Sequence, residues 1–122
     1  MPITKQSVTI LALNSVPAGL TKASPNESAV VNCSAYYGGE LTFRILNGAS
    51  APTVPCTITF QVSHDGTKWF DYYTVAGDST ANSDSTGAII LDRGIMYLKL
   101  IAYGNTVNAV QVEAYLQAVT GV

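Results

Sequence analysis

The sequence has few charged residues and few of the residue types that build catalytic or metal sites. Charged residues make up only 11% of the chain, and it contains one histidine and two cysteines. The six basic residues are scattered along the sequence, which excludes the basic stripe that neutralises nucleic-acid phosphates. No apolar run approaches the roughly 20 residues of a membrane-spanning helix. We therefore expect neither nucleic acid nor a membrane as a partner.

The two cysteines, Cys33 and Cys56, form no CxxC pair and have no histidine at metal-ligand spacing. A pair is also too few for the disulfide framework of a small secreted domain. We expect two buried free thiols, with a single bridge as the alternative, and we expect no metal or cofactor. The start of the chain, Met1 to Val8, lacks the basic and then apolar layout of a secretory signal, so we expect synthesis in the cytoplasm.

The chain is rich in apolar residues that recur with a period of two. Hydrophobic residues make up 48% of the sequence, and no segment shows a helical period. The clearest alternation runs from Cys56 to Ser63 and from Val110 to Ala118, which predicts two half-buried strands. Further strands are predicted at Met96–Tyr103, Val8–Leu13, Ala29–Asn32, Leu41–Leu46, Trp69–Val75 and Ala88–Leu91. About eight strands without helices predict a single all-β domain over residues 1–122, an antiparallel β-sandwich or jelly roll.

Two segments are predicted to lie outside these strands. Gly77 to Gly87 reads GDSTANSDSTG, whose polar side chains cannot bury a core, so it is predicted as one long loop. Met1 to Ser7 precedes the first strong strand and is predicted to be extended. Two interpretations of this N-terminal segment stay open, an arm onto a neighbouring subunit or a frayed end.

The Asp65-Gly66 turn determines which side chains of the next strand share the apolar face of Phe60. A two-residue turn would pair Val62 with Trp69 and bury Asp71 without a partner, at a cost of several kcal/mol. A loop of three residues, with Gly66 left-handed, would pair Phe60 with Phe70 instead. We favour the second register, because it leaves Asp71 on the polar face.

The favoured register places an aromatic surface on the polar side of the sheet. Trp69 and Tyr73 then lie two positions from Asp71, and further tyrosines fall on the polar phases of their strands. Aromatic residues at positions of expected exposure favour a protein interface, although a loop could instead fold over this face and bury Trp69. The candidate interface residues are Trp69, Asp71, Tyr73, Tyr97, Tyr103 and Tyr115.

The remaining polar residues form no recognisable catalytic constellation. His64 abuts Asp65 in a tight turn, where neighbouring side chains point apart, and no motif supplies a nucleophile. The carboxylates show no pair facing across a cleft, and the run Asp78 to Asp84 lacks the glycine and glutamate positions of a helix-loop-helix calcium site. We expect a protein that is not an enzyme and has no catalytic residues.

Two hairpins resemble those of a known group of proteins. The segment Val62 to Trp69, the strand Tyr97 to Leu100, and the hairpin from Tyr103-Gly104-Asn105 to Leu116 are similar to the small β-sandwich virion proteins of tailed bacteriophages. The resemblance implies a capsid decoration, cement or head-tail accessory protein without enzymatic activity. It also implies binding to other virion proteins and to copies of itself, with a trimer favoured.

A second function, from another class, stays open at this point. A β-sandwich that presents Trp69 and Tyr73 near Asp71 could stack on sugar rings and hydrogen-bond their hydroxyls, as a carbohydrate-binding module does. A glycan is therefore the alternative partner.

Overall fold

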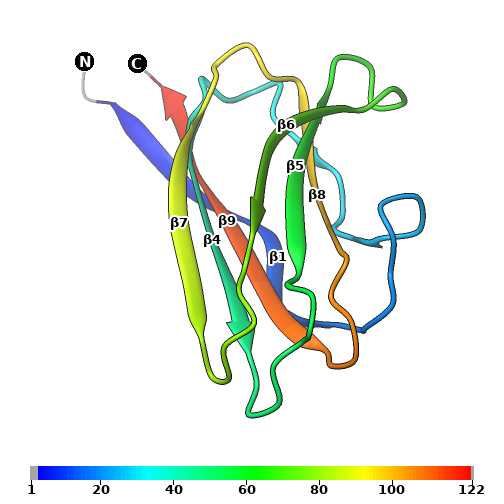
Figure 1. Cartoon of the computed structure of the whole chain (residues 1–122). Coiled ribbons are helices and arrows are strands. Elements are labelled where there is room, and N and C mark those ends of the chain that lie inside the picture. Colours follow the sequence, from blue (N-terminus) through cyan, green and yellow to red (C-terminus); the bar gives the residue numbers. More distant parts are fainter. Residues whose placement is uncertain (1–2, 122) are drawn as a thin grey trace.

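The computed structural model describes residues 3–121, and within them the chain forms nine β-strands and no helix. The strands form two antiparallel sheets that pack face to face, which confirms the predicted all-β sandwich (Figure 1). Two of the nine, β2 and β3, contain only two residues each. The strands are β1 (Thr4–Val16), β2 (Asn26–Glu27), β3 (Val31–Asn32), β4 (Gly39–Asn47), β5 (Thr57–Ser63), β6 (Phe70–Ala76), β7 (Asp84–Leu91), β8 (Tyr97–Tyr103) and β9 (Val110–Gly121).

Each sheet places its most apolar strands in the centre. The first sheet has the order β1-β9-β4-β7, and the second has the order β2-β8-β5-β6, with β3 also paired to β8. Strands β1 and β9 come from opposite ends of the chain and lie side by side. The edges are therefore β1 and β7 in the first sheet, and β6 and the short β2 and β3 in the second.

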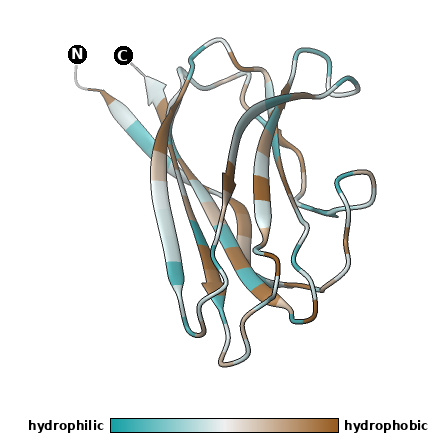
Figure 2. Cartoon of the chain, in the orientation of Figure 1, coloured by the Kyte–Doolittle hydropathy of each residue, from teal (hydrophilic) through white to brown (hydrophobic). Residues whose placement is uncertain are grey.

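The core fills the space between the sheets and follows the alternation of the sequence. Ile58 and Phe60 of β5 are fully buried, as is Leu116 of β9. Figure 2 shows the alternation as hydrophobic bands along these two strands. Cys33 and Cys56 are both buried and free, which confirms the predicted thiols, and burial raises the pKa of each to about 11. Both thiols are therefore protonated near neutral pH.

The long loop predicted at Gly77 to Gly87 is wrong over its last four residues. Strand β7 begins at Asp84, and eight consecutive residues pair with β4 without a register shift. The polar composition misled the prediction because β7 is an edge strand, whose outward positions carry Asp84 and Thr86. Gly87 fits the strand because the ring of Phe43 covers it: an added Cβ would lie 2.5 Å from Phe43 Cζ.

The first strand begins at Thr4, four residues before the predicted start at Val8. Lys5 pairs with Val119 and Ser7 with Gln117 in the neighbouring β9. The described part of the predicted arm is thus the edge of a sheet, and its contact with a neighbouring subunit stays a prediction. Met1 and Pro2 lie outside the described residues.

Candidate functional site

The hairpin between β5 and β6 follows neither of the two predicted registers. Val62 pairs with Phe70 across a loop that runs from His64 to Trp69, and the register shifts between Phe60 and Gln61. Gln61 pairs with Asp71 but Phe60 pairs with Tyr73, so Tyr72 is the extra residue of a β-bulge. The longer loop and the bulge together determine which aromatic side chains face outward.

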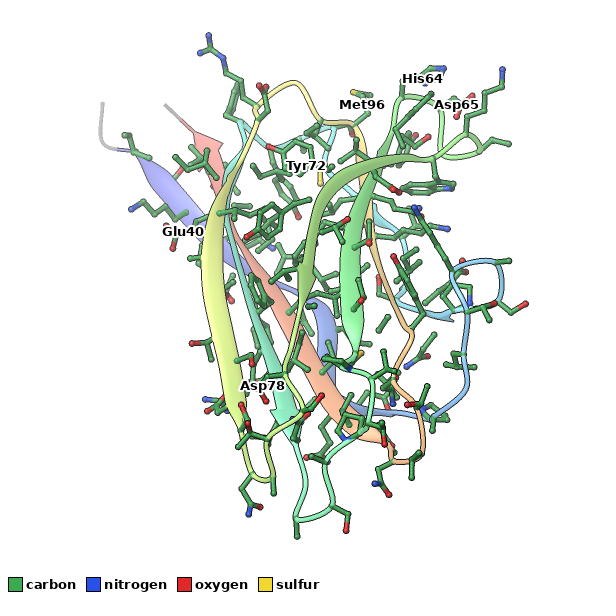
Figure 3. The ribbon with its side chains drawn as sticks, in the orientation of Figure 1. Glu40, His64, Asp65, Tyr72, Asp78 and Met96 are labelled. Carbon is green, nitrogen blue, oxygen red and sulfur yellow. The ribbon has the colours of Figure 1, made fainter. Side chains whose placement is uncertain are left out.

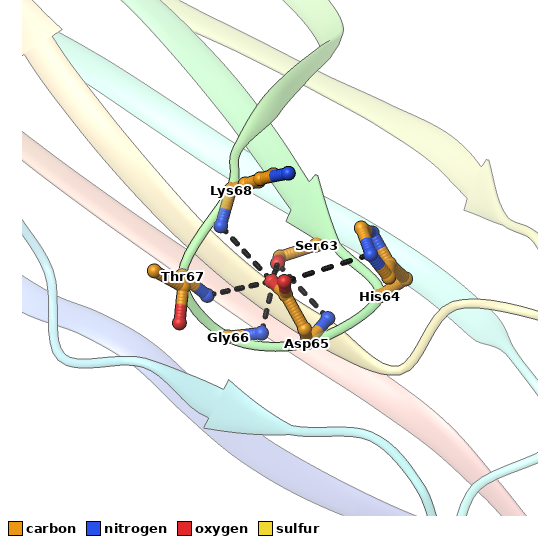
Figure 4. Close-up of polar contacts among 6 residues, drawn as sticks. All are labelled: Ser63, His64, Asp65, Gly66, Thr67 and Lys68. Atoms are coloured by element: carbon orange, nitrogen blue, oxygen red, sulfur yellow. Dashed lines mark hydrogen bonds and ion pairs between the residues drawn. The ribbon is translucent and has the colours of Figure 1, made fainter.

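The loop is held in shape by Ser63 and Asp65 (Figure 4). Asp65 Oδ1 accepts hydrogen bonds from the backbone N–H groups of Thr67 and Lys68 at 2.8 and 2.9 Å, and Ser63 Oγ accepts one from Gly66 at 2.8 Å. The pKa of Asp65 is lowered to about 2, mainly because the backbone bonds from Lys68 and Thr67 stabilise the ionised carboxylate. Gly66 has a left-handed φ of 81°, as predicted.

Ser63, His64 and Asp65 have the residue types of a hydrolytic triad, but their contacts follow a different order. Ser63 Oγ donates to Asp65 Oδ1 at 3.0 Å, and His64 Nε2 lies 3.5 Å from Asp65 Oδ2. The carboxylate therefore lies between the hydroxyl and the imidazole, whereas a triad places the imidazole in that position. The three side chains build a turn. Among residues 3–121, no group of three or more His, Cys, Asp and Glu side chains is placed to hold a metal ion.

Asp71 lies on the outer face of the second sheet, beside Gln61, on the side that the favoured register predicted. Gln61 Nε2 donates to Asp71 Oδ1 at 3.0 Å, and Lys22 Nζ forms an ion pair with the other carboxylate oxygen. The Lys22 contact, followed by the Gln61 bond, lowers the pKa of Asp71. The segment between β1 and β2, which carries Lys22, therefore reaches over this face.

Trp69 lies next to this network with one face of its ring occupied. Lys99 Nζ lies 4.6 Å from the Trp69 ring centroid, in a cation–π contact, and 3.2 Å from Glu27 Oε1. The Lys99 side chain is only 12% exposed. Trp69 is half-buried, between the open contact surface and the covered position that the sequence left as alternatives.

Tyr73 faces the core, which corrects its predicted place beside Trp69 and Asp71. It pairs with Phe60, and its ring centroid lies 6.3 Å from that of Phe43. The bulge at Tyr72 is the reason, because one extra residue moves every following side chain of β6 to the opposite face. The Trp69–Tyr73 pair on which the glycan alternative rests is thus divided between two faces.

The other three predicted tyrosines lie at separate places. Tyr97 lies beneath the β5–β6 loop, where an added Cβ on Gly66 would come within 3.8 Å of its ring. Tyr103 lies on the same outer face, with its hydroxyl 3.2 Å from the buried Thr59 Oγ1. Tyr115 lies on the outer face of the other sheet and donates to Glu113 at 3.0 Å. The structure therefore brings together Trp69, Asp71, Tyr97 and Tyr103 on one sheet face.

An apolar groove that the sequence did not predict lies at the end of the sandwich that carries the β5–β6 loop, here called the loop end. It is about 280 Å³ in volume. Phe70 is 59% exposed and Met96 is 40% exposed. His64, Asp65 and Met96 gather at this end, and Asp78 lies at the other (Figure 3). The lining residues of the apolar groove are Val62, Ser63, His64, Phe70, Gly94, Ile95 and Met96. No signal in the sequence marks it, because Phe70 pairs with Val62 on the inner face of the sheet and is exposed only because it lies at the open end of the sandwich.

A second, larger depression of about 650 Å³ lies on the outer face of the first sheet. Lys5 and Arg93 supply positive charge to its lining, and Glu40 and Asp92 supply negative charge. Its apolar part includes Ile90, which at 79% exposure is the most exposed large apolar side chain within residues 3–121.

Comparison of the sequence with protein-family profiles and with curated proteins gives no match. Within the described residues, no helix is long and apolar enough to cross a membrane. The fold, in contrast, is shared with several solved structures.

The similar structures differ widely in origin. The SPBc2 prophage-derived protein YomS is 17% identical, with 96% of each chain covered and a TM-score of 0.50. The subunit of the disulfide-linked pili that form Bacillus endospore appendages is 13% identical, with 100% of this chain and 93% of the other covered and a TM-score of 0.59. The K1 cleaved adhesin domain of Lys-gingipain from Porphyromonas gingivalis is 11% identical, with 96% and 84% covered and a TM-score of 0.60. At these identities the likeness establishes a shared β-sandwich fold.

Proposed function

We propose that the chain is a non-enzymatic structural protein of a bacteriophage particle, a capsid decoration protein that binds the particle and stabilises it. The observation that carries the proposal is the apolar groove at the loop end. Phe70 is 59% exposed there, although large aromatic side chains of this kind are the ones that protein interfaces bury. Contact with a particle protein would remove Phe70 and Met96 from water.

The adjoining loop supports a role in binding. Asp65 and Ser63 fix the backbone from Asp65 to Lys68 by hydrogen bonds of 2.8 to 3.3 Å. A loop that is ordered before contact loses little conformational entropy on binding, which favours affinity. His64 is exposed beside the groove, with its ring centroid 6.4 Å from that of Phe70, and adds a polar rim.

The fold also supports the proposal. One similar structure is a prophage-derived protein and another is the subunit of a pilus, so the same sandwich occurs in an assembled appendage. The fold serves other purposes as well, as the adhesin domain illustrates. The exposed groove is therefore stronger support for the proposed function than the shared fold.

Immunogold electron microscopy can test the proposal. An antibody against the purified chain is applied to particles sedimented from a lysate of the source organism, and we expect regularly spaced label on the particles. Label that remains only in the unsedimented fraction would contradict the proposal. Binding of the chain to a glycan array, lost in Trp69→Ala, would favour the glycan alternative instead.

A pair of matched variants tests the role of the groove. Phe70→Ser removes an exposed aromatic ring from the groove, and we expect particle affinity to fall about 10- to 100-fold, because a buried Phe contributes about 1.5–3 kcal/mol. Val54→Ser is the control, since Val54 is 49% exposed in the β4–β5 connection at the opposite end of the sandwich. We expect the control to bind like the unmodified chain in a co-sedimentation titration.

A further inference from the structure

The free edge of β7 exposes unpaired backbone groups at alternate residues. Asn47 N–H of β4 donates to Ser83 O at 2.9 Å, so the backbone N–H and C=O groups of Ser83 face β4. Backbone orientation alternates along a strand, so the backbone groups of Ser85, Gly87 and Ile89 face β4 as well. The backbone groups of the alternate residues must then face away from the sheet. Tyr72 confirms this direction, because its hydroxyl, reaching from β6, donates to Ile90 O at 2.9 Å.

Tyr72 also limits the length of the open edge. Its hydroxyl accepts a hydrogen bond from Asp92 N at 3.1 Å, so the end of β7 near Ile90 O is already occupied. No hydrogen bond from elsewhere in residues 3–121 reaches the outward backbone groups of Asp84, Thr86 or Ala88. The open stretch therefore runs from Asp84 to Ala88, and Thr86 is its centre.

The other sheet edges carry features that hinder pairing with another chain. Strand β1 has three register irregularities and carries Lys5, and β6 has the bulge at Tyr72. Strands β2 and β3 are only two residues long. Bulges, charges and short strands are the usual protections of an exposed edge.

Strand β7 lacks these protections. Its eight residues pair regularly with β4, and its one charged residue, Asp84, is neutralised by Arg44 Nε at 3.1 Å. Ser85 to Ile90 carry no charge. A regular, uncharged edge of this length is a template for another strand.

We propose that β7 pairs antiparallel with β7 of a second copy of this chain, about a two-fold axis at Thr86. In this register Thr86 lies opposite Thr86 of the copy, and Asp84 lies opposite Ala88. Each of the three pairs exchanges two backbone hydrogen bonds, roughly six in total. The two sheets join into one continuous sheet across the dimer.

The chemistry of the edge favours a second copy as the partner. A two-fold axis at Thr86 pairs each open backbone group with an open group of the other chain, and the two Thr86 side chains become cross-strand neighbours that can hydrogen-bond. An axis at Ala88 would instead place Asp84 opposite Asp92, two like charges. It would also require the backbone groups Ile90 O and Asp92 N, which are already hydrogen-bonded to Tyr72. The inference concerns the isolated chain and goes beyond the proposed function, since it holds whether or not the chain belongs to a particle.

The test compares two Thr→Lys variants at the two edges of one sheet. Thr86→Lys places a charge at the centre of the proposed contact, whereas Thr9→Lys places it on exposed β1. Sedimentation equilibrium should give twice the chain mass for the unmodified protein. We expect Thr86→Lys to weaken the dimer at least tenfold and Thr9→Lys to leave it unchanged. A monomer, an odd-numbered oligomer, or a dimer that Thr86→Lys does not weaken would overturn the proposal.

Hydrogen exchange on the unmodified chain gives a second test that needs no variant to fold. The backbone amides of Thr86 and Ala88 face outward. In the monomer their hydrogens should therefore exchange with solvent faster than those of strand amides that are hydrogen-bonded within the sheet. Their protection should rise with protein concentration, while that of Ser85 and Gly87, which face β4, should not change. Equal exchange of Thr86 and Ala88 at low and high concentration would overturn the proposal.

Discussion

Asp65 acts on its loop mainly through its charge. Its carboxylate accepts two backbone N–H bonds and one from Ser63, and each of these bonds is stronger when the carboxyl group is ionised. The same contacts lower its pKa from 3.8 to about 2. The ionised Asp65 therefore contributes to the shape of the loop beside the apolar groove, together with the bonds that Ser63 Oγ accepts.

The pH dependence of stability should report this charge. Because the folded-state pKa lies below the ordinary value, ionised Asp65 stabilises the fold fully above about pH 4, and this contribution is lost as pH falls from 3.8 to about 2. Asp65→Asn keeps an acceptor oxygen but loses the titration. We expect the difference in unfolding free energy between the two proteins to be constant above pH 5 and to shrink toward pH 2. A difference that does not vary with pH, measured by urea unfolding, would contradict the assignment.

At the scale of the strand, β7 depends on close packing between Gly87 and Phe43. The Phe43 ring is held in place by neighbours, since its centroid lies 6.2 Å from that of Phe60 and 6.3 Å from that of Tyr73. It cannot move aside for a methyl group at Gly87 without disturbing these rings. A glycine within a strand is therefore favourable here, despite its entropic cost.

Gly87→Ala should destabilise the protein by up to about 2 kcal/mol net, because overpacking a core usually costs about 1–3 kcal/mol. The entropic benefit of replacing glycine, about 0.4–1 kcal/mol, opposes this cost and does not exceed it. Gly48→Ala is the matched control, because no atom lies within 4 Å of its added Cβ. We expect the control to stay within about 0.5 kcal/mol of the unmodified chain in thermal or denaturant unfolding. Equal stabilities of the two variants would contradict the packing argument.

Strands with one face in the core were predictable from sequence, and edge features were not. Ile58 and Phe60 alternate with polar residues, so β5 could be located before the structure was known. The first half of β7, Asp84 to Gly87, resembled a loop because its outward side chains meet water. The bulge at Tyr72 has no local sequence signal, since its hydroxyl bonds to Ile90 and Asp92 are long-range contacts. This one residue moved Tyr73 from the outer face to the core and so separated it from Trp69 and Asp71.

At the scale of the whole molecule, the apolar groove lies at the end of the sandwich where β7 ends. Gly94, Ile95 and Met96 line the groove and follow β7 directly in the chain. An antiparallel β7 pair reverses the strand direction across the two-fold axis, so the two grooves of a dimer lie at opposite ends of the joined sheet. If both proposals hold, such a dimer has one particle-binding groove at each end and can connect two neighbouring subunits of the particle.

This arrangement predicts that binding and stabilisation can be separated. Thr86→Lys leaves the groove intact, so it should still bind the particle, but as a single-ended monomer it cannot link two subunits. We expect bound unmodified chain to raise the temperature at which heated particles release their DNA, measured by a dye that fluoresces on free DNA. At the same occupancy, Thr86→Lys should raise it much less, and Thr9→Lys should match the unmodified chain. Equal protection by Thr86→Lys would show that the chain stabilises the particle through the groove alone.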